Sequence, residues 1–225
     1  MHHPEIARPA LAARGTGFLQ RVNHLMRCTA ALVLIGLASA PGWAQVRATS
    51  SDQVVFPQGL QWQRMQSVSI YIREAPHVRS ENPALVPVVT SVWADEIDRL
   101  LAQARGHRET ALVGQVEMRG RSVHFSLLTL PDFDRCEPPL NGKDVVDMYD
   151  KCLARVAIGP VQRPHVIEFR DFCILNVDYD QNAPLEQNHT QFAFDQATST
   201  AYFRVIQHGR FVPACNRSIR LEGLR

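Results

Sequence analysis

The stretch NVDYDQNAPLEQNHT, residues 176–190, is the first whose side chains have types and spacing suited to chemistry. Asp178, Asp180 and Asn182 place oxygen-bearing side chains at alternate positions, as the loop of an EF-hand calcium site does. Glu186 falls at the ninth position of such a loop, where a further oxygen is often supplied.

Two other positions depart from the calcium-loop pattern. Ala183 stands where the sharp turn needs a glycine, and His189 stands where the bidentate glutamate belongs. The flanks are typical of strand and loop rather than of two helices. The sequence therefore favours an ordinary turn, opened by Asp and Asn, over a metal site.

A second group of acids lies in the loop PDFDRCE, which contains Asp132, Asp134 and Glu137. Paired carboxylates can hydrolyse glycosidic bonds, so these residues are candidate catalytic acids. Three acids in one loop more often form a solvated rim, and such a rim could also meet a basic partner. We favour the rim.

His124 is the fourth catalytic candidate. If a hairpin turns at residues 119–120, His124 lies on its polar face, opposite Gln115 and diagonal to Glu117. A His–Glu pair can transfer protons, but a surface contact between strands is the more common role of such a pair. The chain has neither a glycine-rich phosphate loop nor a serine in a nucleophile motif, and we expect no cofactor.

An export signal is the clearest feature of the first fifty residues. Residues 26–44 contain Arg27, an apolar run too short to span a bilayer, and small residues before Gln45, so we expect a signal peptide over 1–44 with cleavage after Ala44. Residues 1–25 belong to an extended n-region if translation starts at Met1, and they are not translated if it starts at Met26. The sequence thus predicts a periplasmic or secreted protein without a stable membrane anchor.

Four cysteines follow the predicted cleavage site. An even number in an exported chain predicts two disulfides, which four cysteines can form in three pairings. We favour Cys136 with Cys152 and Cys173 with Cys215. Metal ligation would require close spacing such as C-x-x-C, which the sequence lacks.

The charge of the predicted mature chain is balanced. The whole sequence has 24 Lys and Arg and 22 Asp and Glu, of which four arginines and Glu5 lie in 1–44, leaving 20 basic and 21 acidic groups. No basic patch with interleaved aromatic residues is present. We therefore expect no nucleic-acid partner.

The pattern of apolar residues predicts the main elements. After a flexible lead over 45–65, residues 67–73 alternate as a half-buried strand does. A helix is expected from an N-cap at Thr90 or Ser91 to just before Gly106, and a β-hairpin over 110–130. Residues 143–156 show a helical apolar stripe, and the remainder reads mostly as strands.

These elements predict one domain over 66–225 of the α+β class, with a mainly antiparallel sheet, two main helices and two disulfides. Strand alternation places Phe192 and Phe194 on one face. If Tyr202 or Phe211 faces outward instead, the last strands carry an exposed apolar patch, which usually marks a binding surface.

The leading functional hypothesis is an exported, non-enzymatic protein that binds another envelope or exported protein. It would serve as an inhibitor, an immunity factor or an accessory part of an envelope or secretion assembly. The first alternative is an envelope hydrolase of peptidoglycan or glycan that uses the candidate acids and His124. The second is a small-ligand carrier, for which a closed apolar cavity would be the sign.

Overall fold

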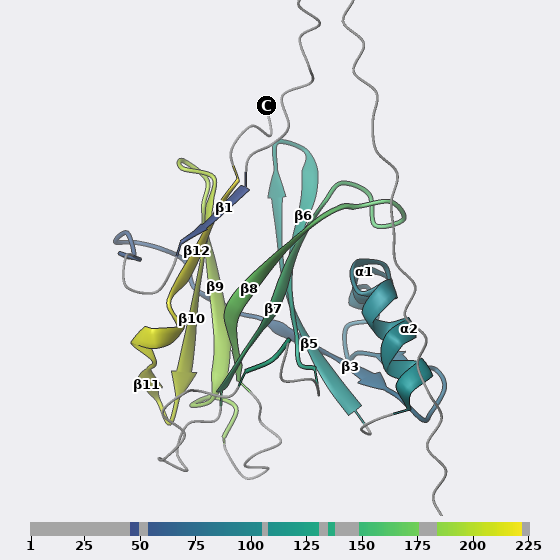
Figure 1. Ribbon diagram of the computed structural model, residues 1–225. Coiled ribbons are helices and arrows are strands. Elements are labelled where there is room, and N and C mark those ends of the chain that lie inside the picture. Colours follow the sequence, from purple (N-terminus) through teal and green to yellow (C-terminus); the bar gives the residue numbers. More distant parts are fainter. Residues whose placement is uncertain are drawn as a thin grey trace, which may run out of the picture. The chain divides into compact units, whose positions relative to one another are not determined.

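The computed structural model (Figure 1) describes one part of the chain in detail. All described residues belong to one compact unit, Pro41–Arg225. The predicted signal peptide lies outside the described residues. The described residues are 46–49, 54–104, 108–130, 135–137, 149–175 and 184–221.

Two antiparallel sheets form the framework. Sheet A has the order β1-β12-β10-β9-β2, with β11 also paired to β10, and sheet B has the order β4-β3-β5-β6-β7-β8. The strands of sheet A are β1 (Val46–Thr49), β2 (Gln63–Arg64), β9 (His189–Asp195), β10 (Thr200–Gln207), β11 (Arg210–Phe211) and β12 (Arg217–Leu221). Those of sheet B are β3 (Gln66–Tyr71), β4 (Val78–Arg79), β5 (Arg108–Met118), β6 (Arg121–Leu128), β7 (Tyr149–Ile158) and β8 (His165–Leu175).

The β5–β6 hairpin confirms the predicted register. Met118 pairs with Arg121 across a turn in which Arg119 and Gly120 both have positive φ, 52° and 72°. Leu112 pairs with Leu127, so their side chains share the face that points toward sheet A. The predicted alternation and the turn agree here because one face of the hairpin is buried against the other sheet.

The main core lies between the two sheets. Phe125 of β6 contacts Phe192 and Phe194 of β9 and Phe203 of β10, with ring centroids 5.6–6.4 Å apart. Phe203 also contacts Phe172 of β8 edge-on, at 5.4 Å. Phe192 and Phe194 thus share one face, as the alternation predicts, and that face is buried.

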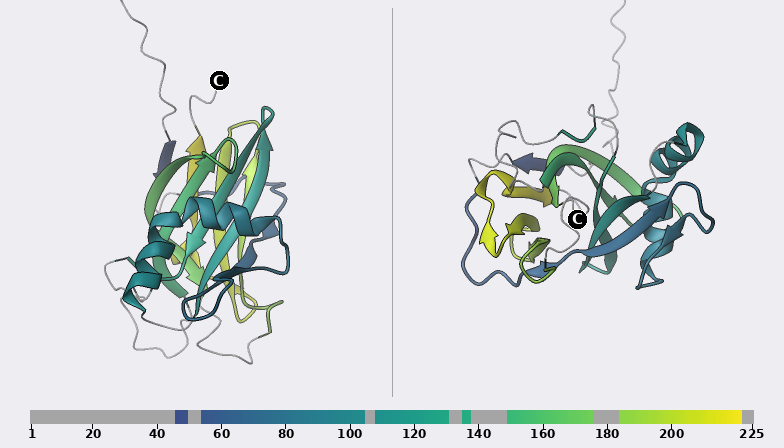
Figure 2. Two further views of the ribbon diagram at one scale, coloured as in Figure 1. Left: turned by 90° about the vertical axis from the view of Figure 1, so that its right-hand side faces the viewer. Right: turned by 90° about the horizontal axis from the view of Figure 1, so that it is seen from below.

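Two helices cover the opposite face of sheet B (Figure 2). They are α1 (Leu85–Val92) and α2 (Ala94–Gln103), separated by Trp93. Trp93 is fully buried, and its indole Nε1 donates a hydrogen bond to Ser126 of β6 at 2.8 Å.

The single helix predicted from Thr90 or Ser91 is therefore two helices, and the first begins earlier. A proline is tolerated in the first turn of a helix, so Pro87 does not prevent α1 from starting at Leu85. The Thr90 hydroxyl donates to the carbonyl of Val86 rather than capping a helix. Gly106 lies outside the described residues.

The second predicted helix, over 143–156, is wrong for residues 149–156, which belong to β7. Residues 141–148 lie outside the described part of the chain. β7 is an interior strand of sheet B, between β6 and β8, and nearly all of its side chains are buried. A strand buried on both faces has no polar alternation, so its apolar residues match a helical stripe as well.

Both favoured disulfides are present, Cys136–Cys152 and Cys173–Cys215. The first joins a short segment to strand β7 rather than to a helix. The second joins β8 of sheet B to the 3-10 turn η3 (Pro213–Cys215), which precedes β12 of sheet A.

The fold agrees with the predicted class only coarsely. The described residues form two antiparallel sheets, two α-helices and two disulfides, and strands predominate. Strands β1 and β2 lie within the predicted flexible lead 45–65, and they pair with β12 and β9. Among the helices of the described part, none is long and apolar enough to cross a bilayer.

Candidate functional site

Two of the four residues proposed for catalysis, His124 and Glu137, lie in the described part of the structure. His124 pairs with Gln115, as predicted, but it is buried at 4% exposure rather than lying at the surface. Glu137 is exposed and forms an isolated bridge with Lys151. Asp132 and Asp134 lie outside the described residues.

His124 is unsuited to act on a substrate from solution. Burial lowers the pKa of its imidazole below the ordinary value, and the nearby carboxylate of Glu117 only partly opposes this effect. A His124–Glu117 pair at the surface was expected, but the His124 side chain is buried. The expectation of an exposed histidine is wrong because both faces of β6 are buried from Val123 onward.

Only one of the four calcium candidates, Glu186, lies in the described part of the chain. Asp178, Asp180 and Asn182 lie outside the described residues, and Glu186 is exposed in the turn before β9. Within the described ranges, no three His, Cys, Asp or Glu side chains gather closely enough to hold a metal ion. The calcium hypothesis thus stays a sequence prediction.

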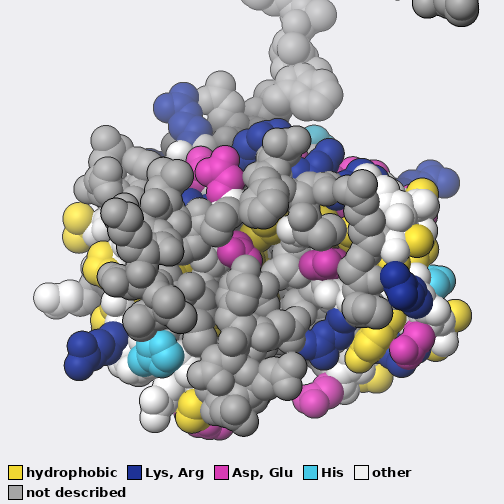
Figure 3. Space-filling model, turned by 60° about the horizontal axis from the view of Figure 1, so that its bottom comes forward, with side chains coloured by type: hydrophobic (Ala, Val, Ile, Leu, Met, Phe, Trp, Pro, Cys, Tyr) yellow, Lys and Arg dark blue, Asp and Glu magenta, His cyan; other side chains and the backbone are white. Residues whose placement is uncertain are grey.

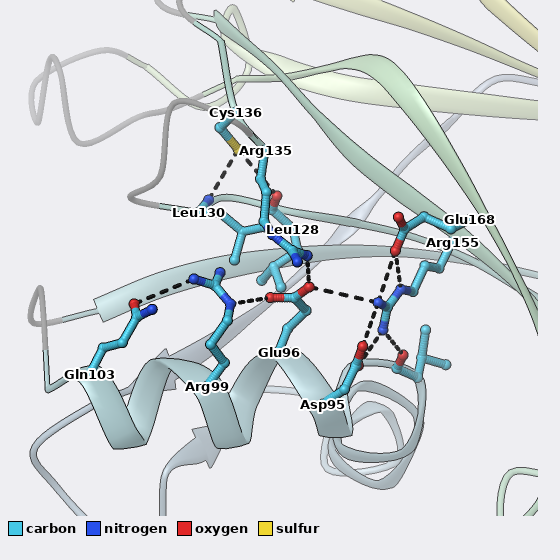
Figure 4. Close-up of polar contacts among 11 residues, drawn as sticks. Asp95, Glu96, Arg99, Gln103, Leu128, Leu130, Arg135, Cys136, Arg155 and Glu168 are labelled. Carbon is cyan, nitrogen blue, oxygen red and sulfur yellow. Dashed lines mark hydrogen bonds and ion pairs between the residues drawn. The ribbon is translucent and has the colours of Figure 1, made fainter. Parts of the chain in front are cut away.

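An ion network with a buried arginine and a buried glutamate lies between α2 and sheet B (Figure 4). Arg155 of β7, 8% exposed, donates to Asp95 at 2.5 and 2.8 Å and to Glu168 at 2.9 Å. Glu96, 2% exposed, accepts from Arg99 at 2.8 Å and also from Arg135.

Both buried charges, those of Arg155 and Glu96, face opposite charges, so the network holds α2 on the sheet. The bonds from Arg155 lower the pKa of Asp95 below its ordinary value. The guanidinium of Arg155 also lies over the ring of Trp93, 4.4 Å from its centroid. The network has a structural explanation without a ligand.

A different arginine lies on the outer face of sheet A, away from the inter-sheet core. Arg204 of β10 lies over the ring of Trp62 at 3.8 Å and over that of Phe211 at 4.5 Å. Its Nε donates to Oε1 of Gln191 at 2.7 Å. Removal from water lowers the pKa of Arg204.

Aromatic rings extend this surface. Phe56 contacts Trp62 edge-on at 4.9 Å and Tyr202 at 6.0 Å, and Phe211 is 59% exposed. Together with Arg204 they form what we call the Arg204 surface, made up of Phe56, Trp62, Tyr202, Arg204 and Phe211. Tyr202 and Phe211 therefore face outward, which meets the condition set by the sequence for an exposed apolar patch.

Hydrogen bonds fix the polar edge of the Arg204 surface. The amide of Gln191 bridges Arg204 and His189, whose Nε2 is 2.8 Å from Gln191 Nε2. The amide nitrogen can only donate, so His189 accepts at Nε2 and donates from Nδ1 to the carbonyl of Leu185, 2.9 Å away. Burial and the charges of Arg64 and Arg204 lower the pKa of His189, which fits this neutral form.

The Arg204 surface is positively charged. Arg64 of β2 pairs with Gln191 and thus lies on the same face as Arg204. Within the described part of the chain, neither Arg64 nor Arg204 forms an ion pair with a carboxylate. This contrasts with Arg155, which is paired with two acids.

Sequence reasoning identified Tyr202 and Phe211 but not Phe56, Trp62 or Arg204. Phe56 and Trp62 fall in the segment read as a flexible lead, although a tryptophan in such a segment is itself a sign of packing. Arg204 alternates with Phe203 and Val205, which marks it as outward-facing. Its stacking on Trp62 depends on contacts between distant segments.

No family model, curated protein or solved structure matches this chain.

Proposed function

We propose that this chain is an exported, non-enzymatic binding protein that engages another envelope or exported protein through the Arg204 surface. The observation that carries the proposal is Arg204 itself, held between Trp62 and Phe211 with no carboxylate partner among the described residues. Trp, Tyr and Arg are the residue types that contribute most to binding energy in protein interfaces.

The chemistry of this surface defines the partner. A guanidinium covered by a partner must be neutralised there, because an unpaired buried charge is costly. The aromatic rings around Arg204 favour apolar contact. The partner segment therefore carries an Asp or Glu side chain beside aliphatic or aromatic residues.

Export is the second part of the proposal. Residues 26–44 have the order of charged, apolar and small residues typical of a signal peptide. Two disulfides accompany this pattern, and disulfides persist in oxidising compartments such as the periplasm. The protein accordingly works in the periplasm or outside the cell.

The test compares capture by matched variants. The full chain is produced in a host that exports it to an oxidising compartment, immobilised, and exposed to an envelope extract of its source. Phe211→Ala and Arg204→Met alter the Arg204 surface, and Arg163→Ala alters an exposed arginine in the β7–β8 turn. Proteins retained by each variant are quantified by mass spectrometry, and the retained partner is then purified for titration.

We expect one partner that is retained by the wild type and by Arg163→Ala. Phe211→Ala and Arg204→Met should each weaken the titrated affinity at least tenfold, or about 1.4 kcal/mol. The charge-reversing change Arg64→Glu should also weaken binding, mostly through a slower association rate. Equal retention by all variants, or no retained protein, would contradict the proposal.

A further inference from the structure

A cleft of about 580 Å³ lies at one end of the space between the two sheets. Strand β9 begins and strand β8 ends there, at the lower end of Figure 1. The cleft lies on the inward side of sheet A and Arg204 on the outer side, while Arg64 and His189 at the edge of the sheet adjoin both. Its lining includes Met65, Ser67, Ser69, Thr110, Leu112, Leu175 and Thr190.

Small side chains keep this end of the inter-sheet space open. Ser67 pairs with Leu112, and Ser69 pairs with Thr110, so both serines are on the face of β3 that points toward sheet A. Farther along the sheets the same space is filled by Phe125 and its neighbours. Ser67 is exposed and Ser69 is half-buried, because no large side chain covers them.

Thr190 of β9 faces the cleft from the opposite sheet. It pairs with Val205 on the inward face of sheet A and is 3% exposed. Its hydroxyl oxygen is buried and has no hydrogen-bond partner among the described residues. Leaving a buried hydroxyl unsatisfied is unfavourable, so a hydrogen-bonding group brought to this oxygen would be stabilising.

Three more residues with hydroxyl groups line the cleft. Those of Ser67, Ser69 and Thr110 form no hydrogen bond with another described residue. Other polar side chains of the lining are already engaged. Asn82 donates to Gln66 at 2.9 Å.

The charges around the cleft do not favour an ion. Arg64 and Glu81, both exposed, border it with opposite signs. Arg79 is bound to the carbonyl of Pro76 at 2.9 Å and lies over the ring of Tyr71. Figure 3 shows this end of the molecule, where basic and acidic side chains are interspersed over the described surface.

We infer that this cleft binds a small neutral polyhydroxyl ligand, that is, a mono- or disaccharide. Hydroxyl groups that can both donate and accept match the edges of a sugar, while Leu112, Leu175 and Met65 offer apolar contact to its C–H face. The volume lies within the range of small-molecule sites, roughly 300–1,000 Å³.

The experiment is a titration of the full, disulfide-bonded chain followed by amide NMR. The probes are glucose, N-acetylglucosamine and a disaccharide of each at millimolar concentration, with glucuronate as the charged counterpart. Thr190→Val removes the buried hydroxyl at nearly constant shape. Thr90→Val makes the same change at an exposed site on α1, outside the cleft.

We expect saturable shifts at Ser67, Ser69 and Thr190 with at least one neutral sugar. Thr190→Val should bind that sugar roughly tenfold more weakly, as expected for one lost hydrogen bond, while Thr90→Val binds it as the wild type does. Ser69→Ala, a change at the surface of the cleft, provides the same test if Thr190→Val fails to fold.

Any one of several results would overturn this inference. They are the failure of every neutral sugar to bind, equal affinity of wild type, Thr190→Val and Ser69→Ala, and binding of glucuronate alone. Shifts confined to the Arg204 surface would also overturn it. Failure here leaves the protein-binding proposal unaffected, because Arg204 and Phe211 lie on the face of sheet A opposite Thr190, and neither Arg204→Met nor Phe211→Ala alters the lining of the cleft.

Discussion

At the scale of single residues, two arginines stack on tryptophans in opposite surroundings. Arg155 lies over Trp93 and is paired with Asp95 and Glu168. Arg204 lies over Trp62 with an amide as its hydrogen-bond partner. The same side-chain chemistry therefore stabilises the fold in one place and leaves a charge without a carboxylate partner, among the described residues, in the other.

This contrast predicts different effects of the same substitution on stability. Arg155→Met should lower the free energy of unfolding by about 3 kcal/mol, because it leaves the network around buried Glu96 without one of its cations. Arg204→Met should lower it by less than about 1 kcal/mol, the range of a partly exposed cation–π contact. Urea unfolding of both variants checks this; equal losses would refute the distinction.

A pH dependence follows from His124. Burial holds its pKa below the ordinary value in the folded protein, so the unfolded chain takes up a proton at a higher pH. Its contribution to stability is present above about pH 6.5 and declines as the pH falls below it. His124→Gln should reduce the loss of unfolding free energy between about pH 7 and pH 5.

Urea titrations at the two pH values measure this loss, and His165→Gln, at an exposed position of β8, is the matched control. The control should keep the wild-type dependence. An unchanged dependence in His124→Gln would mean that other groups cause it.

At the scale of elements, burial decides what the sequence predicts. β3 and the β5–β6 hairpin were predicted because polar and apolar residues alternate along them. The alternation is weak in β7, because this strand is covered on both faces. Its apolar residues therefore also fit the stripe of a helix, which is why the sequence predicts one there. The division of the α1–α2 segment at Trp93 depends on the fit of that indole against Ser126, a contact that local pattern does not encode.

The candidate sites were predictable only in part for the same reason. Alternation identifies Tyr202 as outward and Phe203 as inward once one of them is known to be buried. The contact of Phe56 with Tyr202 and the position of Thr190 opposite Ser67 depend on how distant strands pair. One sequence alone does not specify that pairing.

The spacing of the two sheets predicts the effect of a single methyl group. A Cβ added at Gly114 of β5 would lie 2.7–2.9 Å from three ring atoms of Phe192. Gly114→Ala should therefore lower the free energy of unfolding by about 1–3 kcal/mol through overpacking. Urea unfolding measures this loss.

The control is the double variant Gly114→Ala/Phe192→Leu. It should be less destabilised than the sum of its single changes, because the smaller side chain removes the clash. Additive losses would show that the ring is not the cause.

At the scale of the whole molecule, the two disulfides constrain different lengths of chain. Cys136–Cys152 spans 16 residues, and Cys173–Cys215 spans 42 residues and connects the two sheets. In the chain-entropy model, their removal should cost about 3 and about 4 kcal/mol respectively. Replacing each pair by alanines and measuring urea unfolding tests this order; a larger loss for the shorter loop would contradict it.

The distribution of the strands between the sheets has a consequence for how the chain folds as it is made. Sheet B comes from one continuous run of sequence, Gln66 to Leu175, and β5 to β8 pair in chain order. Sheet A needs the segments before and after that run, because β1 pairs with β12 and β2 pairs with β9.

A chain that emerges from its N-terminus can therefore assemble sheet B first, while β1 and β2 wait without partners until the last strands appear. Throughout that interval the aromatic face of sheet B around Phe125 is uncovered. Chaperone protection is thus needed most after β8 has emerged and before β9 to β12 cover that face.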